Sequence, residues 1–281
     1  MAESGIINLN KPSGISSAAA VGAIRRISRL PCGHMGTLDP LASGVLPVAV
    51  GNATRLFGYL LDKEKTYAAV FRFGEETDTL DTEGTVLRTG GRVPAEDEIR
   101  ESLPAFAGEI DQIPPQYSAK SIGGVRAYAL ARRGEHADLA ARRVKVFSFE
   151  LTGRRGAGEY AFRIRCGAGT YIRALGRDLA AHLGTCAVMT ELVREASGIF
   201  RIEDSVTPAD LNGGWRDFLF PPDSVVDYPC FYAEGEEARR LRNGMPVPSG
   251  GTGFSKLYLD GAFYGIAESA DGMLRAKTKL V

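Results

Sequence analysis

The residues best suited to chemistry lie in a glycine-rich segment, residues 33–46, around a single carboxylate, Asp39. Pro40 disfavours the helical conformation of the residue before it, so Asp39 is expected on an extended or turn backbone. Three glycines in the segment allow another part of the backbone to approach closely. A carboxylate held in this way is a candidate nucleophile, general acid or general base. Because Asp-Pro is also a common turn, composition alone leaves a purely structural role open.

A second candidate segment, residues 166–175, runs from a predicted strand through small residues into the first turn of a predicted helix. The unpaired N–H groups and the positive end of the helix dipole at such a point can bind an anion. Arg173 gains nothing from that dipole, so its position indicates a specific partner. Asp39 is one candidate partner, and Asp178 or solvent is the alternative. The glycines of this segment lack the spacing of a dinucleotide-binding fingerprint.

Side chains that bind metals are few and scattered along the chain. The sequence has four cysteines and three histidines, with no C-x-x-C and no H-x-x-x-H pair. We therefore expect free thiols in a reducing compartment and no metal held by the protein.

The composition is that of an ordinary globular protein, since 44% of the 281 residues are hydrophobic and 24% are charged. A chain of this length buries enough surface to fold without disulfides, and a disordered chain is excluded. No apolar run reaches the roughly 18 residues of a membrane span, and residues 1–4 lack the basic and apolar parts of a signal peptide. The sequence therefore predicts a cytoplasmic protein with no membrane segment.

The charges are unevenly distributed, although the net charge is zero. Residues 112–201 contain 15 Lys and Arg against 7 Asp and Glu. Most of these cations are arginines, whose planar fork suits phosphate contacts. One interpretation is a nucleic-acid-binding face. The other is a solvated surface whose charge is balanced by the acidic segment 61–111 folding beside it.

The elements that must position these residues follow from the pattern of apolar side chains. Strands are predicted for residues 5–10 and 67–73, together with a hairpin of residues 143–151 and 159–166, while residues 33–53 read as a glycine-rich loop apart from the apolar stretch 45–50. Helices are predicted for residues 17–30, 94–106, 125–133 and 170–183. Because strands and helices interleave without a regular βαβ rhythm, the predicted fold is α+β, with a mixed or largely antiparallel sheet flanked by helices.

A cluster of prolines between residues 208 and 229 marks a predicted domain boundary. Beyond it, short strands are predicted for residues 256–259, 262–267 and 274–277. We therefore divide the chain into a catalytic domain, residues 1–228, and a small β domain, residues 229–281. The second domain is too small for a large active site and is expected to be an accessory binder.

Three blocks of sequence together resemble the TruB-type pseudouridine synthases, the tRNA pseudouridine-55 synthase family. They are Asn-Lys-Pro-Ser-Gly-Ile-Ser at 10–16, Gly-His-Met-Gly-Thr-Leu-Asp-Pro at 33–40 and Gly-Thr-Tyr-Ile-Arg-Ala-Leu at 169–175. Residues 65–67, 113–119 and 192–200 extend the resemblance in the family's order, so that it covers roughly residues 5–202. Residues 233–281 resemble, more weakly, the small PUA β-domain that follows the catalytic body.

The resemblance implies a pseudouridine synthase catalytic fold with a PUA-like module, acting on the uridine at position 55 in the T loop of tRNA. The target base is flipped into a pocket, the C1′–N1 bond breaks, the base turns, and C1′ joins C5. Asp39 is implied as the catalytic aspartate, which attacks C1′ or takes a proton from the sugar. No metal or other cofactor is required, and the implied partner is the T arm of tRNA, bound by a monomer.

The resemblance also implies how the target nucleotide is held. Tyr67 stacks on the target base, Tyr171 and the backbone at Leu192 line the uracil pocket, and His34 lies beside the flipped nucleotide. From its residues alone, Tyr67 begins an apolar strand and is equally a core tyrosine.

The resemblance also bears on Arg173, Lys11 and Met35. Arg173 pairs with Asp39 and is expected to lower its pKa, which keeps the carboxylate ionised. Lys11 is expected to support the catalytic loop rather than to react. Met35 departs from the family, which usually has a small hydroxylated or basic residue at this position.

Two other functions stay open at this point. A non-catalytic RNA-binding or RNA-folding protein would share the same body if Asp39 served only to position Arg173. A small-molecule nucleotide enzyme would use the turn of residues 167–170 for phosphate. Asp39→Ala separates the first from an isomerase, and micromolar binding of a mononucleotide would indicate the second.

Overall fold

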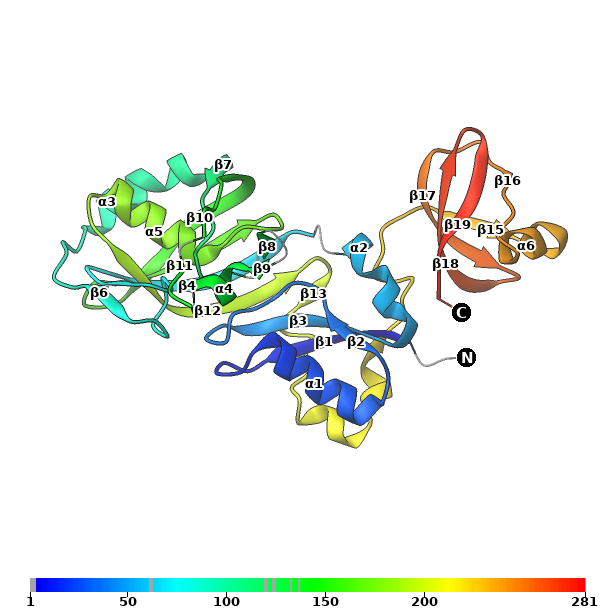
Figure 1. The fold of residues 1–281 in the computed structure, drawn as a ribbon, viewed down its shortest axis with the longest axis horizontal. Helices are drawn as coiled ribbons and strands as arrows, with labels where there is room; N and C mark the ends of the chain where they lie inside the picture. Colours follow the sequence, from blue (N-terminus) through cyan, green and yellow to red (C-terminus); the bar gives the residue numbers. More distant parts are fainter. Residues whose placement is uncertain are drawn as a thin grey trace.

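A computed structural model describes residues 4–60, 63–118, 121–122, 125–131, 133–135 and 137–280. Two sheets organise these residues, a large sheet of ten strands and a smaller sheet of five (Figure 1). Helices cover parts of the large sheet, so the predicted α+β class is confirmed. Within the described part of the chain, no helix is long and apolar enough to cross a membrane.

The large sheet has the strand order β14-β1-β3-β12-β4-β11-β10-β7, with β2 paired to β3 and β13 paired to β12. All its pairs are antiparallel except β3 with β12, so the sheet is mixed and largely antiparallel, as predicted. Its strands are β1 (Gly5–Lys11), β2 (Cys32–His34), β3 (Ser43–Val50), β4 (Lys65–Phe73), β7 (Gly108–Gln112), β10 (Arg142–Gly156), β11 (Glu159–Cys166), β12 (Ala187–Ser197), β13 (Phe200–Arg201) and β14 (Leu219–Phe220). Two short hairpins lie outside it, β5 (Glu76–Thr77) with β6 (Val86–Arg88) and β8 (Ser121–Ile122) with β9 (Val125–Arg126).

The predicted hairpin is present as β10 and β11, whereas β12 was not predicted. This strand lies between β3 and β4 and is buried along most of its length. Its first three residues are buried without a break, and charged residues at 191, 194 and 195 interrupt the rest, so the strand lacks the regular alternation by which strands are recognised. The strand nearest the middle of the catalytic sheet was therefore missed.

The helices differ in extent from the predicted ones. The helices are α1 (Ser17–Ser28), α2 (Phe57–Leu60), α3 (Glu96–Ser102), α4 (Ala127–Ala131), α5 (Ile172–His182) and α6 (Gly235–Arg242). Ser16 caps α1 by accepting a hydrogen bond from the Ala19 N–H at 3.1 Å. The helix stops before the predicted residue 30 because Arg29 is left-handed, with φ 57°. In place of the predicted helix 125–133, Val125–Arg126 is strand β9 and helix begins at Ala127; residue 132 lies outside the described residues.

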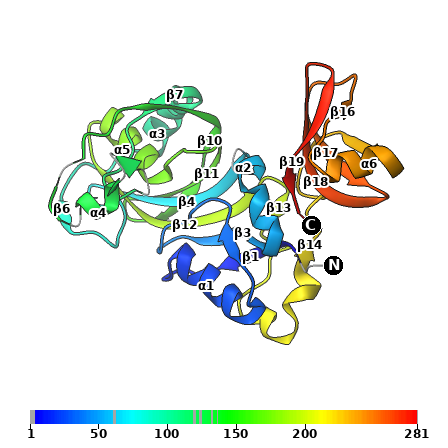
Figure 2. The same cartoon turned by 45° about the vertical axis from the view of Figure 1, so that its right-hand side comes forward.

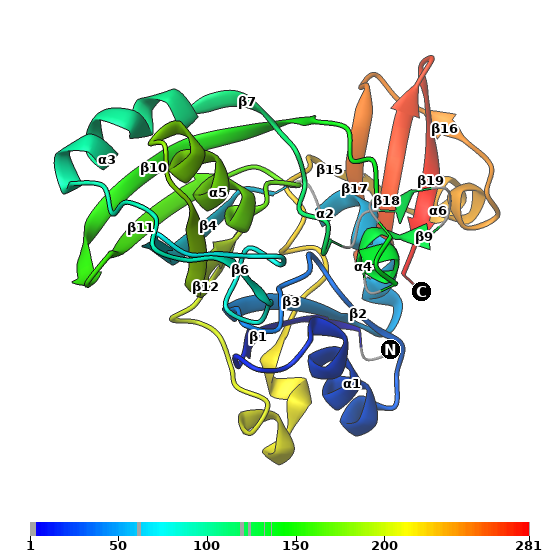
Figure 3. The same cartoon turned by 60° about the vertical axis from the view of Figure 1, so that its left-hand side comes forward.

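One face of the large sheet carries an aromatic core covered by α3 and α5 (Figure 3). Phe71 of β4 packs on Phe162 of β11, which in turn packs on Phe149 of β10. Gly176 lets α5 approach closely, because a Cβ there would meet the ring of Phe71 at 2.5 Å. The result is a fixed distance between β4 and α5, the two elements that carry Tyr67 and Arg173.

The small sheet has the order β15-β17-β18-β19-β16 and includes all three strands predicted for the C-terminal segment. Its members are β15 (Cys230–Ala233), β16 (Val247–Pro248), β17 (Gly253–Leu259), β18 (Ala262–Ala270) and β19 (Met273–Lys279). It stands beside the large sheet, with its C-terminal end close to α2 (Figure 2). Asn52 Nδ2 donates to Leu280 O at 2.9 Å and Arg55 to Lys279 O at 2.7 Å, so this end is attached to the body.

Candidate active site

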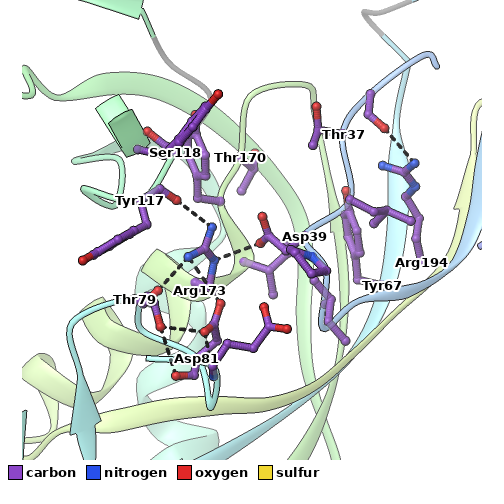
Figure 4. A pocket seen from close by; sticks show the side chains of 18 of the residues that line it. Thr37, Asp39, Tyr67, Thr79, Asp81, Tyr117, Ser118, Thr170, Arg173 and Arg194 are labelled. Atoms are coloured by element: carbon purple, nitrogen blue, oxygen red, sulfur yellow. Dashed lines mark hydrogen bonds and ion pairs between the residues drawn. The ribbon is translucent and has the colours of Figure 1, made fainter. Parts of the chain in front are cut away.

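Asp39 lies in the loop between β2 and β3, at the wall of a cavity of about 830 Å³. The cavity is bounded by the Asp39 loop, β4, the turn of residues 78–85, the segment before α5 and the start of that helix, and β12 (Figure 4). A cavity of this size is within the range of small-molecule and nucleotide sites. The elements that meet here are far apart in the sequence, and the mixed sheet brings them together.

The side chain of Lys11 binds backbone carbonyls, one of them in the Asp39 loop. The Lys11 ammonium is fully buried and donates to the carbonyls of Pro12, Ile15 and Pro40, at 2.9, 2.7 and 3.3 Å. Burial lowers the pKa of Lys11 to about 8. The bond to Pro40 O attaches Lys11 to the Asp39 loop, as predicted, and the other two bonds attach it to the turn after β1.

Arg173 is 5% exposed and faces Asp39 from the first turn of α5. Its Nε lies 2.9 Å from Asp39 Oδ2, so the expected pair is present. Asp178, the alternative partner, instead pairs with Arg177 at 2.8 Å. The other donors of Arg173 are also used, because Nη1 donates to Thr79 O at 2.7 Å and Nη2 donates to Tyr117 O at 3.0 Å.

The sequence reasoning missed Asp81, a second carboxylate beside Arg173. Asp81 is buried, and its Oδ2 lies 3.4 Å from Arg173 Nη1. Its Oδ1 accepts from the Thr79 hydroxyl at 2.6 Å and from the Glu83 N–H at 3.1 Å. The only sequence signal is a run of acidic and hydroxyl residues at 78–84 that is typical of a surface turn. Nothing in that run indicates that this aspartate faces inward.

The pKa of Asp39 is set by burial and by the charges around it. Burial raises the pKa of Asp39 above its ordinary value, and nearby Asp81 raises it further. Arg173 and Lys11 lower it, but the desolvation effect is larger. The expectation that Arg173 lowers the pKa of Asp39 is confirmed, but burial raises that pKa by more, so the net shift is upward. Since the Asp39 side chain is still 32% exposed toward the cavity, a ligand can reach it.

Tyr67, Tyr171 and Leu192 all line the cavity, as the resemblance implied. Tyr67 rises from β4 and is 7% exposed, so it is both a wall of the cavity and part of the core. The backbone of Tyr171 is fixed by Gln112, which donates to Tyr171 O at 3.1 Å and accepts from its N–H at 2.8 Å. Three separate elements thus present these walls to Asp39.

His34 is not brought into the wall of this cavity. It lies on β2, opposite Val48 of β3. Burial lowers the pKa of His34, which favours the neutral imidazole. Its Nδ1 is buried without a hydrogen-bond partner among the described residues. The place beside a flipped nucleotide that the resemblance implied for His34 therefore stays a prediction.

The turn of residues 167–170 borders the same cavity rather than a separate one. Gly169 has φ 81°, a conformation that favours glycine, and the Thr170 hydroxyl donates to Gly167 O at 3.1 Å. No side chain caps the first turn of α5. Among the described residues, no group of three or more His, Cys, Asp or Glu side chains is arranged to hold a metal ion.

The arginines of the basic segment are partly neutralised where β10 and β11 carry them. Arg143 pairs with Asp111 at 3.2 Å, Arg165 with Glu64 at 2.8 Å, and Arg163 with Glu195 at 2.9 Å. Two of these acids belong to segment 61–111, as the balanced-surface interpretation expected. Lys120 and Arg132, also in the basic segment, lie outside the described residues.

Comparison with known proteins places this architecture in one class. A family model described as TruB family pseudouridylate synthase (N terminal domain) matches residues 25–172. The chain is 41% identical over 251 residues to tRNA pseudouridine synthase B of Dehalococcoides mccartyi, covering 86% of this chain and 83% of that protein. It is 38% identical over 285 residues to tRNA pseudouridine synthase B of Dechloromonas aromatica, covering 99% and 95%.

Solved structures agree with the sequence comparisons. A crystal structure of a Cbf5-Nop10-Gar1 complex matches with a TM-score of 0.74 and 27% identity, covering 99% of this chain and 85% of that one. A fold of this kind, with an Asp–Arg pair at the wall of its cavity, defines a pseudouridine synthase. Within that class, the chain belongs to the TruB family of pseudouridylate synthases.

Proposed function

We propose that this protein isomerises the uridine at position 55 in the T loop of tRNA to pseudouridine, with Asp39 as the catalytic residue. The observation that carries the proposal is the contact of Asp39 with Arg173 at the wall of a cavity that also contains Tyr67. One carboxylate, one guanidinium and one aromatic wall suffice for an isomerisation. The curated relatives bear the name of that activity.

The reaction balances without a co-reactant. The C1′–N1 bond breaks with its electron pair left on uracil, while Asp39 attacks C1′ or takes a proton from the sugar. The base then turns and C5 bonds to C1′, as Asp39 either leaves C1′ or returns the proton to the sugar. The proton on C5 is then lost as N1 gains one. Atoms and oxidation level are the same in substrate and product.

Tyr67 provides the stacking surface for the target base. Extracting a base from a folded RNA costs a few kcal/mol, and stacking on an aromatic ring returns about 1–3 kcal/mol of that cost. Tyr171 and Leu192 form the remaining walls of the uracil pocket, while Arg173 orients Asp39. His34 is proposed to lie beside the flipped nucleotide, at the mouth rather than in the wall.

The rest of the molecule is proposed to hold the tRNA. Residues 1–228 form the catalytic domain and grip the T arm, with unpaired cations of residues 112–201 meeting phosphates. Residues 229–281 form a PUA-like module that reaches toward the acceptor side. The protein acts on tRNA as a monomer in the cytoplasm, and no metal or other cofactor takes part.

Modification mapping tests the proposal. An unmodified tRNA transcript is incubated with the wild-type protein, Asp39→Ala or the control Asp178→Asn, an acid that pairs with its neighbour Arg177. Carbodiimide-dependent primer-extension stops report pseudouridine. A single stop in the T loop with the wild type and control, absent with Asp39→Ala, is expected. Tight transcript binding without any stop would indicate an RNA-binding protein instead.

A further inference from the structure

We propose that Arg194 is a positioning residue for this reaction, because it ties both ends of the Asp39 loop to the strand beside Tyr67. The inference rests on the proposed function, since it assigns how Asp39 and the stacking tyrosine are kept in register. Arg194 lines the same cavity from β12, a strand that the sequence did not reveal.

The guanidinium of Arg194 reaches both flanks of the loop. Its Nε donates to Val45 O at 2.6 Å and its Nη2 donates to Gly36 O at 3.0 Å. These two carbonyls bracket Asp39 in the sequence. Together with the Lys11 bond to Pro40 O at 3.3 Å, they hold the loop at its tip and at both ends.

The main chain of Arg194 is equally constrained. In the sheet, Arg194 pairs with Gly44 of β3 on one side and with Tyr67 of β4 on the other. A Cβ on Gly44 would collide with the Arg194 backbone, so only glycine permits this approach. Arg194 and Tyr67 accordingly stand next to each other on neighbouring strands (Figure 4). One residue therefore links the loop of the proposed nucleophile to the proposed stacking ring.

The charge of Arg194 is unusual for its burial. It is 1% exposed, yet in the part of the chain that the structure describes it donates to two backbone carbonyls and interacts with the Tyr67 hydroxyl, not with a carboxylate. Arg173, in the same cavity, pairs with two carboxylates. Burying a cation without a counter-ion costs free energy, so the guanidinium at position 194 must supply something that a neutral side chain cannot.

That requirement is the geometry of the guanidinium. Its planar fork donates in several fixed directions at once, whereas the ammonium of lysine is a compact point charge. The guanidinium also lowers the pKa of the Tyr67 hydroxyl against the larger effect of burial, which places it beside that ring. A loop shifted by about 1 Å relative to the bound base can reduce the reaction rate a hundredfold.

The test compares Arg194→Lys and Arg194→Gln with the wild type and with Arg72→Lys. Arg72 is a matched control because it lies on β4, pairs with Glu159 and does not line the cavity. The single-turnover rate of pseudouridine formation is measured at saturating tRNA transcript, and the Kd is measured by filter binding. We expect both Arg194 variants to react about tenfold to a hundredfold more slowly, with the Kd within about twofold of the wild type and Arg72→Lys unchanged.

Thermal unfolding ensures that folded protein is compared, and Arg194→Gln serves if Arg194→Lys does not fold. An unchanged rate in a folded variant would overturn the proposal. If the Kd also rose tenfold with a shallower salt dependence, that result would indicate that Arg194 contacts a phosphate instead. As a second arm, Tyr67→Phe combined with Arg194→Lys should cost less than the product of the two single effects. Absence of product with the wild type would refute the proposed function itself, which is a separate result.

Discussion

Asp81 and Arg173 form a second ion pair, 3.4 Å between Oδ2 and Nη1, directly behind the pair of Arg173 with Asp39. Arg173 is therefore held from two sides of its guanidinium, and its orientation toward Asp39 depends on this second carboxylate. Asp81 is held in turn by the Thr79 hydroxyl and the Glu83 N–H. Asp39, Arg173 and Asp81 thus form two consecutive ion pairs, and each side chain orients the next.

The first prediction concerns these ion pairs. Asp81→Asn keeps the shape of the side chain but removes the charge that orients Arg173. Because hydrogen bonds to charged groups are worth about 1.5–3 kcal/mol, we expect the single-turnover rate to fall roughly tenfold to a hundredfold. The Kd for the tRNA transcript should stay within about twofold. An unchanged rate would show that Asp81 only stabilises the turn.

The pH dependence of the rate gives a second prediction. The proposed mechanism needs ionised Asp39, whose pKa is raised by burial, so the rate should climb as pH rises through that pKa. Asp81 raises and Arg173 lowers this pKa. Asp81→Asn should therefore move the acid limb of the pH–rate profile to lower pH, and Arg173→Lys should move it to higher pH if the lysine pairs less well. Shifts in the opposite directions would contradict the assignment of this limb to Asp39.

A third prediction concerns Lys11, whose ammonium donates to Pro40 O in the Asp39 loop and to Pro12 O and Ile15 O in the turn after β1. Lys11→Met leaves these acceptors without their donor, so the free energy of unfolding should fall by about 1–3 kcal/mol at pH 7, as measured by urea denaturation. The pKa of Lys11 is about 8 in the folded protein, below its ordinary 10.5. Its charged form therefore costs stability below pH 8, and this cost is lost as pH rises from 8 toward 10.5. The wild type should accordingly gain stability relative to Lys11→Met between pH 7 and pH 9.5; a gap that narrows would contradict this account.

Met35 supplies a fourth prediction, because it departs from the residue usual in the family. It is 3% exposed and belongs to an apolar cluster with Leu56 of the body and Leu280 of the C-terminal segment. Met35→Ser should lower the free energy of unfolding by about 2–4 kcal/mol, since it leaves a cavity and buries a hydroxyl. The Kd for tRNA should not change. Tighter tRNA binding by this variant would mean instead that position 35 faces the RNA.

The sequence identified the parts of the site that have a local signature. Asp39 stood out through its proline and glycines, and Arg173 through its unfavourable place in the first turn of α5. Each of these conclusions needed only neighbouring residues. The resemblance then supplied Tyr67, Tyr171 and Leu192, and the structure brings all three to the cavity.

What the sequence did not indicate depends on long-range burial. Asp81 lies in a run typical of a surface turn and Arg194 in a segment for which no strand or helix is predicted, yet both are almost fully buried. Their burial follows from the position of β12 between β3 and β4, which no local pattern shows. The net pKa shift of Asp39 was missed for the same reason, because desolvation is a property of the assembled cavity.

The most direct test of the account follows the proton on C5 of the target uridine. A tRNA transcript labelled with tritium at C5 of uridine releases tritium to water only when C5 forms its bond to C1′. Under single-turnover conditions, the account predicts about one equivalent released per tRNA by the wild-type protein and none by Asp39→Asn, with both proteins binding the transcript equally. Release by Asp39→Asn at a rate near that of the wild type would contradict the central claim that the Asp39 carboxylate carries the reaction.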